Sequence, residues 1–215
     1  MVELGCGLGA FGARLAASYD EYTGVEPDPE SAAVARGRLA RWSGRVVPDA
    51  GDVPPGSAQV LCAFEVLEHL ADDAAALTDW ARLGAPGALV IVSVPAGPDR
   101  YGPWDEKVGH YRRYARADLE SLFRAGGVEP LAVQHYGFPL GYALEAARNL
   151  VARRRLAADR AASMAARTGG SGRQRQAASP LMGAVRWSAT APFRAWQKLR
   201  SDRGPGLIGV GRLPG

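Results

Sequence analysis

The feature that most restricts the fold of this chain is a regular alternation of strand-like and helix-like segments with short connections. Five strand-like segments occur before residue 96, and they are 1–6, 21–29, 45–51, 58–66 and 88–95. Strands that alternate with helices form parallel sheets whose two faces are covered by helices. The last of these segments (ALVIVSVP) is apolar almost throughout, as expected for a strand buried on both faces. The sequence therefore predicts an α/β fold with a mainly parallel sheet.

The composition of the chain changes near residue 140, and its charge changes with it. Before that point, a helix is predicted over 116–127 and a sixth strand over 128–138. Residues 1–140 carry 12 basic and 19 acidic side chains, whereas residues 141–215 carry 14 basic and 3 acidic ones. The predicted parts are a core of residues 1–140, a basic helical insertion of residues 141–204 with a linker near 169–179, and a strand within 205–215 that returns to the edge of the core sheet.

Length and composition exclude several classes of protein. With 215 residues, the chain is long enough for one hydrophobic core and one appendage. No apolar run approaches the length of a membrane span, and no secretory leader is visible. Cys6 and Cys62 are isolated thiols in apolar surroundings, so neither a disulfide framework nor a cysteine metal site is predicted. We expect a cytoplasmic protein that binds no metal.

A glycine-rich loop follows the first predicted strand. Gly5, Gly7 and Gly9 stand where this strand turns into its helix, and glycine there tolerates positive φ and lets a ligand approach the backbone. Glu26 ends the second strand, where a carboxylate can accept hydrogen bonds from both hydroxyls of a ribose. The glycine spacing also satisfies the dinucleotide fingerprint, and it is compatible with a tight turn that holds no ligand. Together these features indicate a nucleoside-containing cofactor without identifying it.

An acidic residue in the first strand narrows the choice of cofactor. Glu3 lies two residues before Gly5, inside a strand that is predicted to be buried. A buried carboxylate is costly unless it is paired or hydrogen-bonded. A dinucleotide has no evident need for an acid at this point, whereas a cofactor with a positively charged amino group provides a partner for it.

The segments VELGCGLG (2–9) and YTGVEPDP (22–29) together resemble the cofactor signature of the class I S-adenosylmethionine-dependent methyltransferases. The resemblance continues through PDAGDVP, AFEVLEHLADD and GALVIVSVP, in the right order, to about residue 135. Residues 105–127 are similar to a bacterial subgroup in which a Gly-His-x-Arg-Arg-Tyr stretch follows the fifth strand. The resemblance implies a doubly wound, Rossmann-like sheet, S-adenosylmethionine as cofactor, and methyl transfer to a small-molecule or lipid-like acceptor.

The resemblance also assigns roles to individual residues. The implied cofactor-binding residues are Glu3, Gly5, Cys6 and Gly7 at the methionine portion, Gly9 in the same loop, Glu26 at the ribose, Pro27, Asp49 and Ala50 at the adenine, and Phe64 and Glu65 toward the methionine end and the acceptor. Two departures stand out. Gln59 occupies a position that is usually aspartate, and the helical segment that usually precedes the first strand is missing before Met1. Either the true start lies upstream, or the cofactor pocket is unusually open.

Three histidines are candidates for acid–base chemistry. Methyl transfer needs mainly alignment and exclusion of water, and it needs a base only when the acceptor is protonated. His110 lies in the aromatic-rich segment 101–114, which is predicted to be a loop that closes over the methyl group. We interpret His110 as the catalytic base or a substrate contact, with an ordering role in the loop as the alternative. His69 is interpreted as a buried histidine that fixes a turn, and His135 as a packing or surface residue.

Arg112 and Arg113 are open to more than one interpretation. They either bind an acidic group of the substrate, or they are solvated or paired with Asp105 and Glu106.

The basic insertion 141–204 also allows several interpretations, because it combines arginines with Leu, Val, Trp and Phe. It is a helical cap on the sheet, a peripheral contact with anionic membranes, or, least supported because no nucleic-acid module is recognised, a nucleic-acid contact. Pro180 and Pro192 predict helix starts within it.

Two functional alternatives accompany the methyltransferase prediction. A nicotinamide-dependent oxidoreductase uses a similar glycine loop, but its hydride-transfer machinery, such as a Tyr-x-x-x-Lys pair, is absent at Lys107 and Lys198. The other alternative is a non-catalytic protein that has the same fold and binds the cofactor without turnover.

Overall fold

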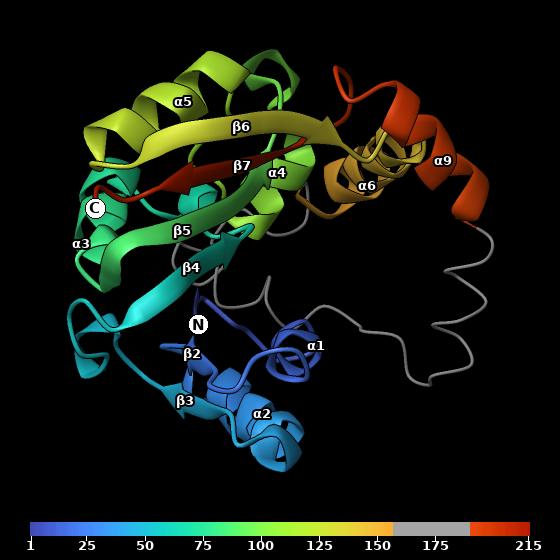
Figure 1. The fold of residues 1–215 in the computed structure, drawn as a ribbon. Coiled ribbons are helices and arrows are strands. Elements are labelled where there is room, and N and C mark those ends of the chain that lie inside the picture. Colours follow the sequence, from blue (N-terminus) through green and yellow to red (C-terminus); the bar gives the residue numbers. More distant parts are fainter. Residues whose placement is uncertain (157–189) are drawn as a thin grey trace.

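Seven strands and the helices around them make up the described part of the chain, residues 1–156 and 190–215 of the computed structural model (Figure 1). The strands are β1 (Val2–Leu4), β2 (Thr23–Val25), β3 (Arg45–Val47), β4 (Ala58–Phe64), β5 (Gly84–Pro95), β6 (Glu129–Tyr136) and β7 (Gly206–Arg212). The helices are α1 (Gly12–Ala16), α2 (Pro29–Leu39), α3 (Asp73–Ala81), α4 (Pro103–Val108), α5 (Arg116–Ala125), α6 (Leu140–Leu156) and α9 (Ala191–Leu199). Short 3-10 turns occur at Ala40–Trp42, Ala50–Asp52, Leu67–His69 and Pro98–Arg100.

The strands form one sheet in the order β3-β2-β1-β4-β5-β7-β6. Strands β1 to β5 pair in parallel, whereas β7 runs antiparallel to both of its neighbours. The chain builds outward from β1 through β2 and β3, and then returns to place β4 on the other side of β1. In such sheets, ligands bind beyond the carboxyl ends of the strands where the order reverses, here at β1 and β4. The predicted α/β fold with a doubly wound, mainly parallel sheet is confirmed.

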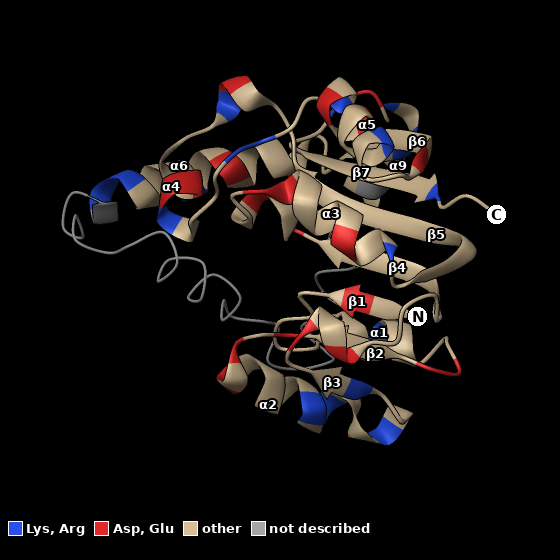
Figure 2. Cartoon of the chain, turned by 90° about the vertical axis from the view of Figure 1, so that its left-hand side faces the viewer, with Lys and Arg blue, Asp and Glu red and all other residues tan. Residues whose placement is uncertain are grey.

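Two hydrophobic cores lie on the two faces of this sheet. The larger core joins Leu4 of β1 to Leu77 of α3 and Phe123 of α5, and the smaller core contains Ala35 of α2 and residues of α1. Because side chains alternate along a strand, Glu3 points away from the larger core, toward the face of α1 and α2. Figure 2 shows this acidic position within a central strand.

The last strand does not lie where the sequence predicted it. We expected it at the edge of the sheet, but β7 lies between β5 and β6, and β6 forms the edge. The glycines of β7 explain how it fits under α5: a Cβ at Gly211 would lie 2.5 Å from Cγ1 of Val128, and one at Gly209 would lie 3.0 Å from Cζ of Phe123. An interior position pairs both sides of β7 and buries Leu207 completely.

The basic insertion is described only at its two ends, α6 and α9. The predicted linker 169–179 and the predicted helix start at Pro180 lie outside the described residues. The helix start at Pro192 is confirmed, because α9 begins at Ala191 with the proline in its first turn. Among residues 1–156 and 190–215, no helix is long and apolar enough to cross a membrane.

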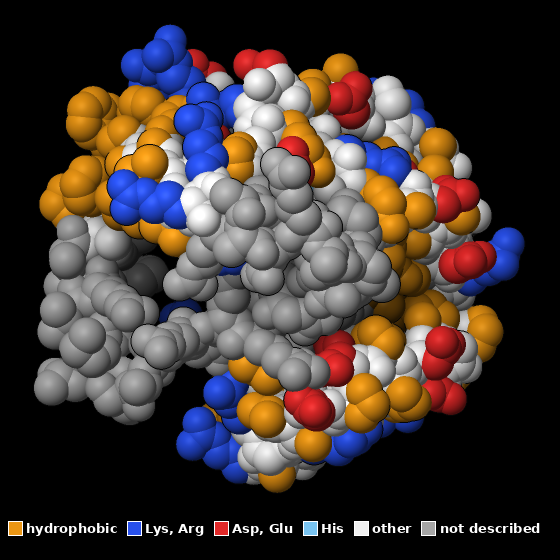
Figure 3. Space-filling model, turned by 180° about the vertical axis from the view of Figure 1, so that it is seen from behind, with side chains coloured by type: hydrophobic (Ala, Val, Ile, Leu, Met, Phe, Trp, Pro, Cys, Tyr) orange, Lys and Arg blue, Asp and Glu red, His pale blue; other side chains and the backbone are white. Residues whose placement is uncertain are grey.

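The surface of α9 is both apolar and basic. Trp196 and Leu199 are 51% and 81% exposed, and hydrophobic side chains gather beside Lys and Arg on this part of the molecule (Figure 3). The three interpretations of the insertion stay predictions.

Candidate functional site

Three neighbouring cavities open beyond the carboxyl ends of the central strands. Cavity 1, of about 450 Å³, is bordered by Gly5, Gly7, Glu26, Pro27, Asp49 and Ala50. Cavity 2, of about 340 Å³, is bordered by Glu3, Cys6, Phe11, Phe64, His69 and His110. Cavity 3, of about 200 Å³, is bordered by Trp104, Asp105, Arg113, Tyr136, Leu144 and Glu145. Cavities 1 and 2 share Gly5 and Gly7, cavities 2 and 3 share His110, and Glu65 borders all three. The predicted site residues, with the exception of Gly9, therefore come together in one continuous tract.

The glycine loop needs its glycines for two different reasons. Gly5, Gly7 and Gly9 all have positive φ, between +53° and +71°. At Gly7, apart from its chain neighbours, no atom of the described residues lies within 4 Å of the place that a Cβ would take, so this side of the loop forms an open cradle at cavities 1 and 2. At Gly9, a Cβ would lie 2.8 Å from that of Ala35. Gly9 was predicted to bind the cofactor, but it borders neither cavity and instead allows α2 to pack closely against the loop.

Glu26 links the end of β2 to the glycine loop. Its Oε2 accepts a hydrogen bond from the Gly7 N–H at 2.8 Å, and its Oε1 accepts one from the Asp28 N–H at 2.9 Å. These bonds fix the carboxylate at the wall of cavity 1, where each oxygen retains a further lone pair for a ligand hydroxyl. Asp49 lies across the same cavity and begins the turn Ala50–Asp52, because its side chain accepts a hydrogen bond from the Gly51 N–H.

Glu3 forms part of the wall of cavity 2 and is only 3% exposed. Its Oε2 accepts a hydrogen bond from the Tyr22 hydroxyl, and both groups lie beside Gly12 at the start of α1. Burial raises the pKa of Glu3 to about 7, although the bond from Tyr22 acts in the opposite direction. A positively charged ligand group in cavity 2 would stabilise the ionised form of this carboxylate.

The raised pKa of Glu3 predicts a pH-dependent loss of stability in the ligand-free protein. Below pH 4.5, Glu3 is protonated in the folded and the unfolded states, so its contribution to stability is fully present. As the pH rises from about 4.5 to about 7, only the unfolded state releases the proton, and stability falls by on the order of 3 kcal/mol. Urea unfolding across this range should show that Glu3→Gln lacks this part of the pH dependence. Parallel stability curves for the two proteins would contradict the prediction.

His110 is held by a buried network rather than by a flexible loop. The segment 101–114 was predicted to be a loop, but it contains the helix α4, whose start is stabilised because Asp105 accepts a hydrogen bond from the Gly102 N–H at 2.9 Å. Nδ1 of His110 lies 2.8 Å from Oδ1 of Asp105, and the Tyr101 hydroxyl donates to the His110 carbonyl. Burial alone would raise the pKa of Asp105, but hydrogen bonds from His110, Arg113 and the Gly102 N–H outweigh it and lower that pKa.

Both arginines of this segment are paired with carboxylates, Arg113 in the interior and Arg112 at the half-buried surface. Arg113 is 7% exposed and contacts Asp105 at 2.8 Å and Glu145 of α6 at 3.2 Å. Arg112 contacts Asp73 at the start of α3, at 2.7 Å. The predicted pairing with Asp105 is thus confirmed for Arg113. The second carboxylate that pairs with Arg113 is that of Glu145 in α6, and the sequence did not indicate this contact.

His69 lies at the edge of the cavities, in the turn that follows β4. Its Nδ1 is 3.3 Å from the Gly109 carbonyl oxygen, and its ring meets that of His110 edge to face, with the centroids 4.6 Å apart. Burial and the neighbouring His110 lower the pKa of His69 to about 4. The bond to Gly109 agrees with the predicted role of fixing a turn, although His69 also borders cavities 1 and 2. His135, in contrast, bonds the Gly204 carbonyl and borders none of the three cavities.

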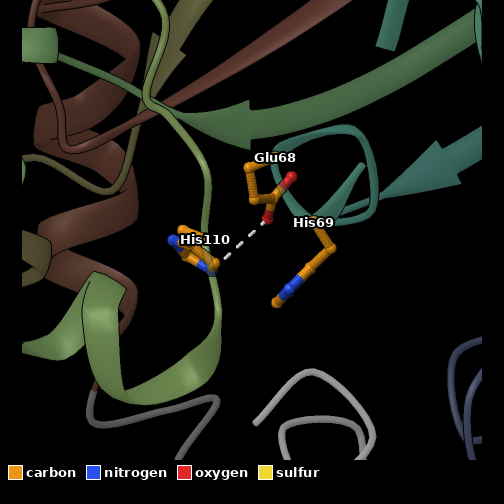
Figure 4. A group of neighbouring side chains, drawn as sticks. All are labelled: Glu68, His69 and His110. Atoms are coloured by element: carbon orange, nitrogen blue, oxygen red, sulfur yellow. Dashed lines mark ion pairs between the residues drawn. The ribbon is translucent and has the colours of Figure 1, made fainter. Parts of the chain in front are cut away.

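The sequence analysis did not single out Glu68 or Tyr136. Glu68 is fully buried beside the two histidines (Figure 4), and burial, together with Glu65 and Asp105, raises its pKa well above the usual value. The signal for Glu68 was its spacing, since it lies three residues after Glu65 and directly before His69. The Tyr136 hydroxyl donates a hydrogen bond to Oε1 of Glu65 at 2.8 Å. The two residues are 71 positions apart, and nothing in the sequence indicated that they are in contact. Glu65 itself has a φ of +58°, which is uncommon for a residue other than glycine.

Comparison with known proteins connects this site to a family. The family profile of a methyltransferase domain matches residues 1–138. An uncharacterized methyltransferase from Mycobacterium sp. (strain JLS) is 34% identical over 122 residues, which are 54% of this chain and 47% of that relative. The chain therefore spans about half the length of this curated relative.

Solved structures share the fold at low sequence identity. The [4+2]-cyclase SpnF superimposes with a TM-score of 0.62 at 18% identity, covering 99% of this chain and 74% of that one. Phosphoethanolamine N-methyltransferase 2 from Haemonchus contortus, in complex with S-adenosyl-L-methionine, superimposes with a TM-score of 0.60 at 17% identity, covering 100% of this chain and 48% of that one. Because the family profile spans well over half of the chain, from β1 to the end of β6, the chain belongs to the methyltransferase-domain family.

Proposed function

We propose that this chain binds S-adenosylmethionine and transfers its methyl group to a small-molecule or lipid-like acceptor. The observation that carries the proposal is the continuous tract of cavities 1 and 2 around the glycine loop. Glu26 stands at one end of this tract and the buried Glu3 at the other. The tract thus offers a carboxylate for ribose hydroxyls and a second carboxylate for an amino group.

The residues around the tract fit the two halves of this cofactor. In cavity 1, Glu26 would accept hydrogen bonds from the ribose hydroxyls, and the adenine would lie near Pro27, Asp49 and Ala50. In cavity 2, the loop at Gly5, Cys6 and Gly7 would hold the methionine portion, with its ammonium group toward Glu3. The open space at Gly7 supports this fit, because any larger residue would occupy the cradle.

Cavity 3 is the proposed site of the methyl acceptor. It meets cavity 2 at Glu65, Trp104 and His110, so an acceptor in cavity 3 would face the methionine end of the cofactor. S-adenosylmethionine supplies a methyl group already bonded to a good leaving group, so the chain contributes mainly alignment and a dry site. With the His110 Nδ1–H donated to Asp105, the Nε2 lone pair is free to take a proton from an acceptor hydroxyl or to bind a cation.

The Gly-His-x-Arg-Arg-Tyr segment supports membership of the bacterial subgroup with this motif. In that segment, His110 and Arg113 both bind Asp105, and the Tyr114 hydroxyl donates to Asp73 at 2.7 Å. The side chains of the motif therefore bind both α4 and the first residue of α3, and they hold these two elements next to the acceptor side of the site.

Removing the Glu26 carboxylate tests the cofactor assignment. We expect Glu26→Ala to bind S-adenosylmethionine about 5- to 150-fold more weakly in calorimetric titration, since it loses hydrogen bonds worth about 1–3 kcal/mol. Glu129→Ala is a matched control, because Glu129 is an exposed carboxylate at the start of β6, outside all three cavities. Equal affinity of Glu26→Ala and wild type would show that the cofactor binds elsewhere.

Methyl transfer itself needs a separate measurement, because the [4+2]-cyclase SpnF has a similar fold and is named for another reaction. A screen of acceptor classes, followed by mass spectrometry for methylated product and S-adenosylhomocysteine, tests it. Cofactor binding with no transfer to any acceptor would favour the non-catalytic alternative, and tighter binding of NAD(H) would favour the oxidoreductase.

A further inference from the structure

A buried carboxylate without a hydrogen-bond partner lies beside the two histidines of the site. The Glu68 side chain is fully buried, and neither of its oxygens has a hydrogen-bond partner among the described residues. Nε2 of His110 is 3.8 Å from Oε1 of Glu68, which is too long for a hydrogen bond. Burying such a group without compensation is costly, so an unsatisfied carboxylate of this kind indicates a missing partner.

A backbone hydrogen bond holds the turn that carries this carboxylate. Glu68 lies in the turn Leu67–His69 between β4 and α3, and its carbonyl oxygen accepts a hydrogen bond from the Tyr111 N–H at 2.7 Å. This bond ties the turn to the segment that carries His110. The bond thus fixes the backbone that carries the buried Glu68 side chain relative to His110.

Both histidines are held in the tautomer that leaves Nε2 free to bind a metal. Nδ1 of His69 faces the Gly109 carbonyl oxygen at 3.3 Å, and a carbonyl oxygen can only accept, so Nδ1 carries the proton. Nδ1 of His110 faces the Asp105 carboxylate at 2.8 Å in the same way. Histidines that bind metals characteristically donate their other N–H to a carbonyl or carboxylate.

The three side chains converge closely enough to share one ion. One ligand atom from each of Glu68, His69 and His110 lies within 4.8 Å of those of the other two. Figure 4 shows the side chains turned toward a common region from the turn after β4 and the segment after α4. Donors bound to one ion at about 2.0–2.2 Å lie roughly 3–4 Å apart, so small side-chain rotations suffice.

We propose that Glu68, His69 and His110 bind one divalent first-row transition-metal cation at the edge of cavity 2. Two imidazoles with one carboxylate favour Zn²⁺, Co²⁺, Fe²⁺ or Mn²⁺ over Mg²⁺ and Ca²⁺, which prefer oxygen donors. The cation would neutralise the Glu68 carboxylate and give its oxygens the missing partner. Because His69 and His110 border cavity 2, the remaining coordination positions face that cavity and take water or an oxygen of the acceptor. The acceptor as a ligand rests on the proposed function, whereas the cation site does not.

Metal titration of the full chain, free of affinity tags and of metal, tests this site. Co²⁺ binding is followed by visible absorption and Zn²⁺ binding by calorimetry, both without cofactor. We expect one ion per chain and at least about tenfold weaker binding in Glu68→Gln, which keeps the size of the side chain, and in His110→Ala. His135→Ala is the matched control, because His135 bonds Gly204 and borders none of cavities 1 to 3, and the metal affinity of this variant should equal that of wild type. Circular dichroism verifies the fold of each variant.

Two results would overturn the inference. One is a wild-type chain that binds neither Co²⁺ nor Zn²⁺ in stoichiometric amount, as expected if Glu68 is simply a protonated core residue. The other is Glu68→Gln that binds the metal as tightly as wild type. Titration of the same preparation with S-adenosylmethionine distinguishes failure of the metal-site proposal from failure of the proposed function. Metal binding without cofactor binding leaves the cation site standing, and cofactor binding without metal binding removes only that site.

Discussion

Replacing Gly7 by valine is expected to abolish S-adenosylmethionine binding while the fold persists. Within residues 1–156 and 190–215, apart from the chain neighbours of Gly7, no atom lies within 4 Å of the place that the new Cβ would take, so the valine side chain enters the cradle between cavities 1 and 2. There it fills the space that the methionine portion requires, and binding should weaken by at least about 100-fold, or about 3 kcal/mol. Calorimetric titration measures the loss, after circular dichroism has verified the fold.

The same substitution at Gly56 is the control that distinguishes a loss of cofactor affinity caused by filling the cradle from one caused by backbone strain. Gly7 has a φ of +53°, and a residue with a Cβ costs about 1–2 kcal/mol in that conformation. Gly56 has a φ of +68° and is exposed in the loop before β4, and none of the described residues other than its chain neighbours comes within 4 Å of the place of a Cβ there. Gly56→Val should therefore lose similar stability but bind the cofactor as wild type does. Wild-type affinity in folded Gly7→Val would place the cofactor outside this loop.

The parts of the fold that the sequence predicted are those with a strong local signal. The strands β4 and β5 are apolar runs bounded by turn residues, and such runs can be recognised without knowledge of their partners. Helix α4 has no such signal, because it has six residues and a mixed composition. A residue that is distant in the sequence stabilises its first turn, since the Trp104 N–H donates a hydrogen bond to the Asn149 side chain of α6 at 2.9 Å. The predicted position of β7 at the edge of the sheet was likewise wrong, because no local feature of the sequence distinguishes an inner strand from an edge strand.

The site also has a part that the sequence predicted well, the cofactor side, and a part that it predicted poorly, the acceptor side. The cofactor side lies within residues 3–50 and the end of β4, and its glycine spacing and terminal carboxylate carry chemical meaning on their own. The acceptor side is assembled from β4, α4, β6 and α6 by pairs such as Glu65 with Tyr136 and Arg113 with Glu145. The sequence indicated Glu65 but not its partner Tyr136, and it gave no sign that Glu145 pairs with Arg113, because each pair forms only when the fold brings distant segments together. Glu68 is an intermediate case, because its spacing from Glu65 and His69 is visible in the sequence, whereas its complete burial is visible only in the fold.

Asp105→Ala should cause the largest loss of stability among single substitutions at the site. Asp105 is fully buried, contacts Arg113 through both carboxylate oxygens, and also binds His110 and the Gly102 N–H. Its removal leaves the Arg113 guanidinium buried with only Glu145 as a charged partner among the residues described. Breaking a buried ion pair from one side typically costs about 3–5 kcal/mol, and we expect about 3 kcal/mol here because Glu145 remains.

Asp118→Ala provides the matched comparison for this loss. Asp118 accepts a hydrogen bond from the Ala115 N–H at the start of α5, at 2.9 Å, as Asp105 does from Gly102 at the start of α4. It is exposed, however, and its removal leaves no buried charge, so about 1 kcal/mol is expected from the lost helix-capping bond alone. Urea unfolding of both variants measures the difference, about 2 kcal/mol, which isolates the buried network from the helix cap. Equal losses in the two variants would mean that Asp105 serves only to begin α4, and that His110 and Arg113 are held in place by their other contacts.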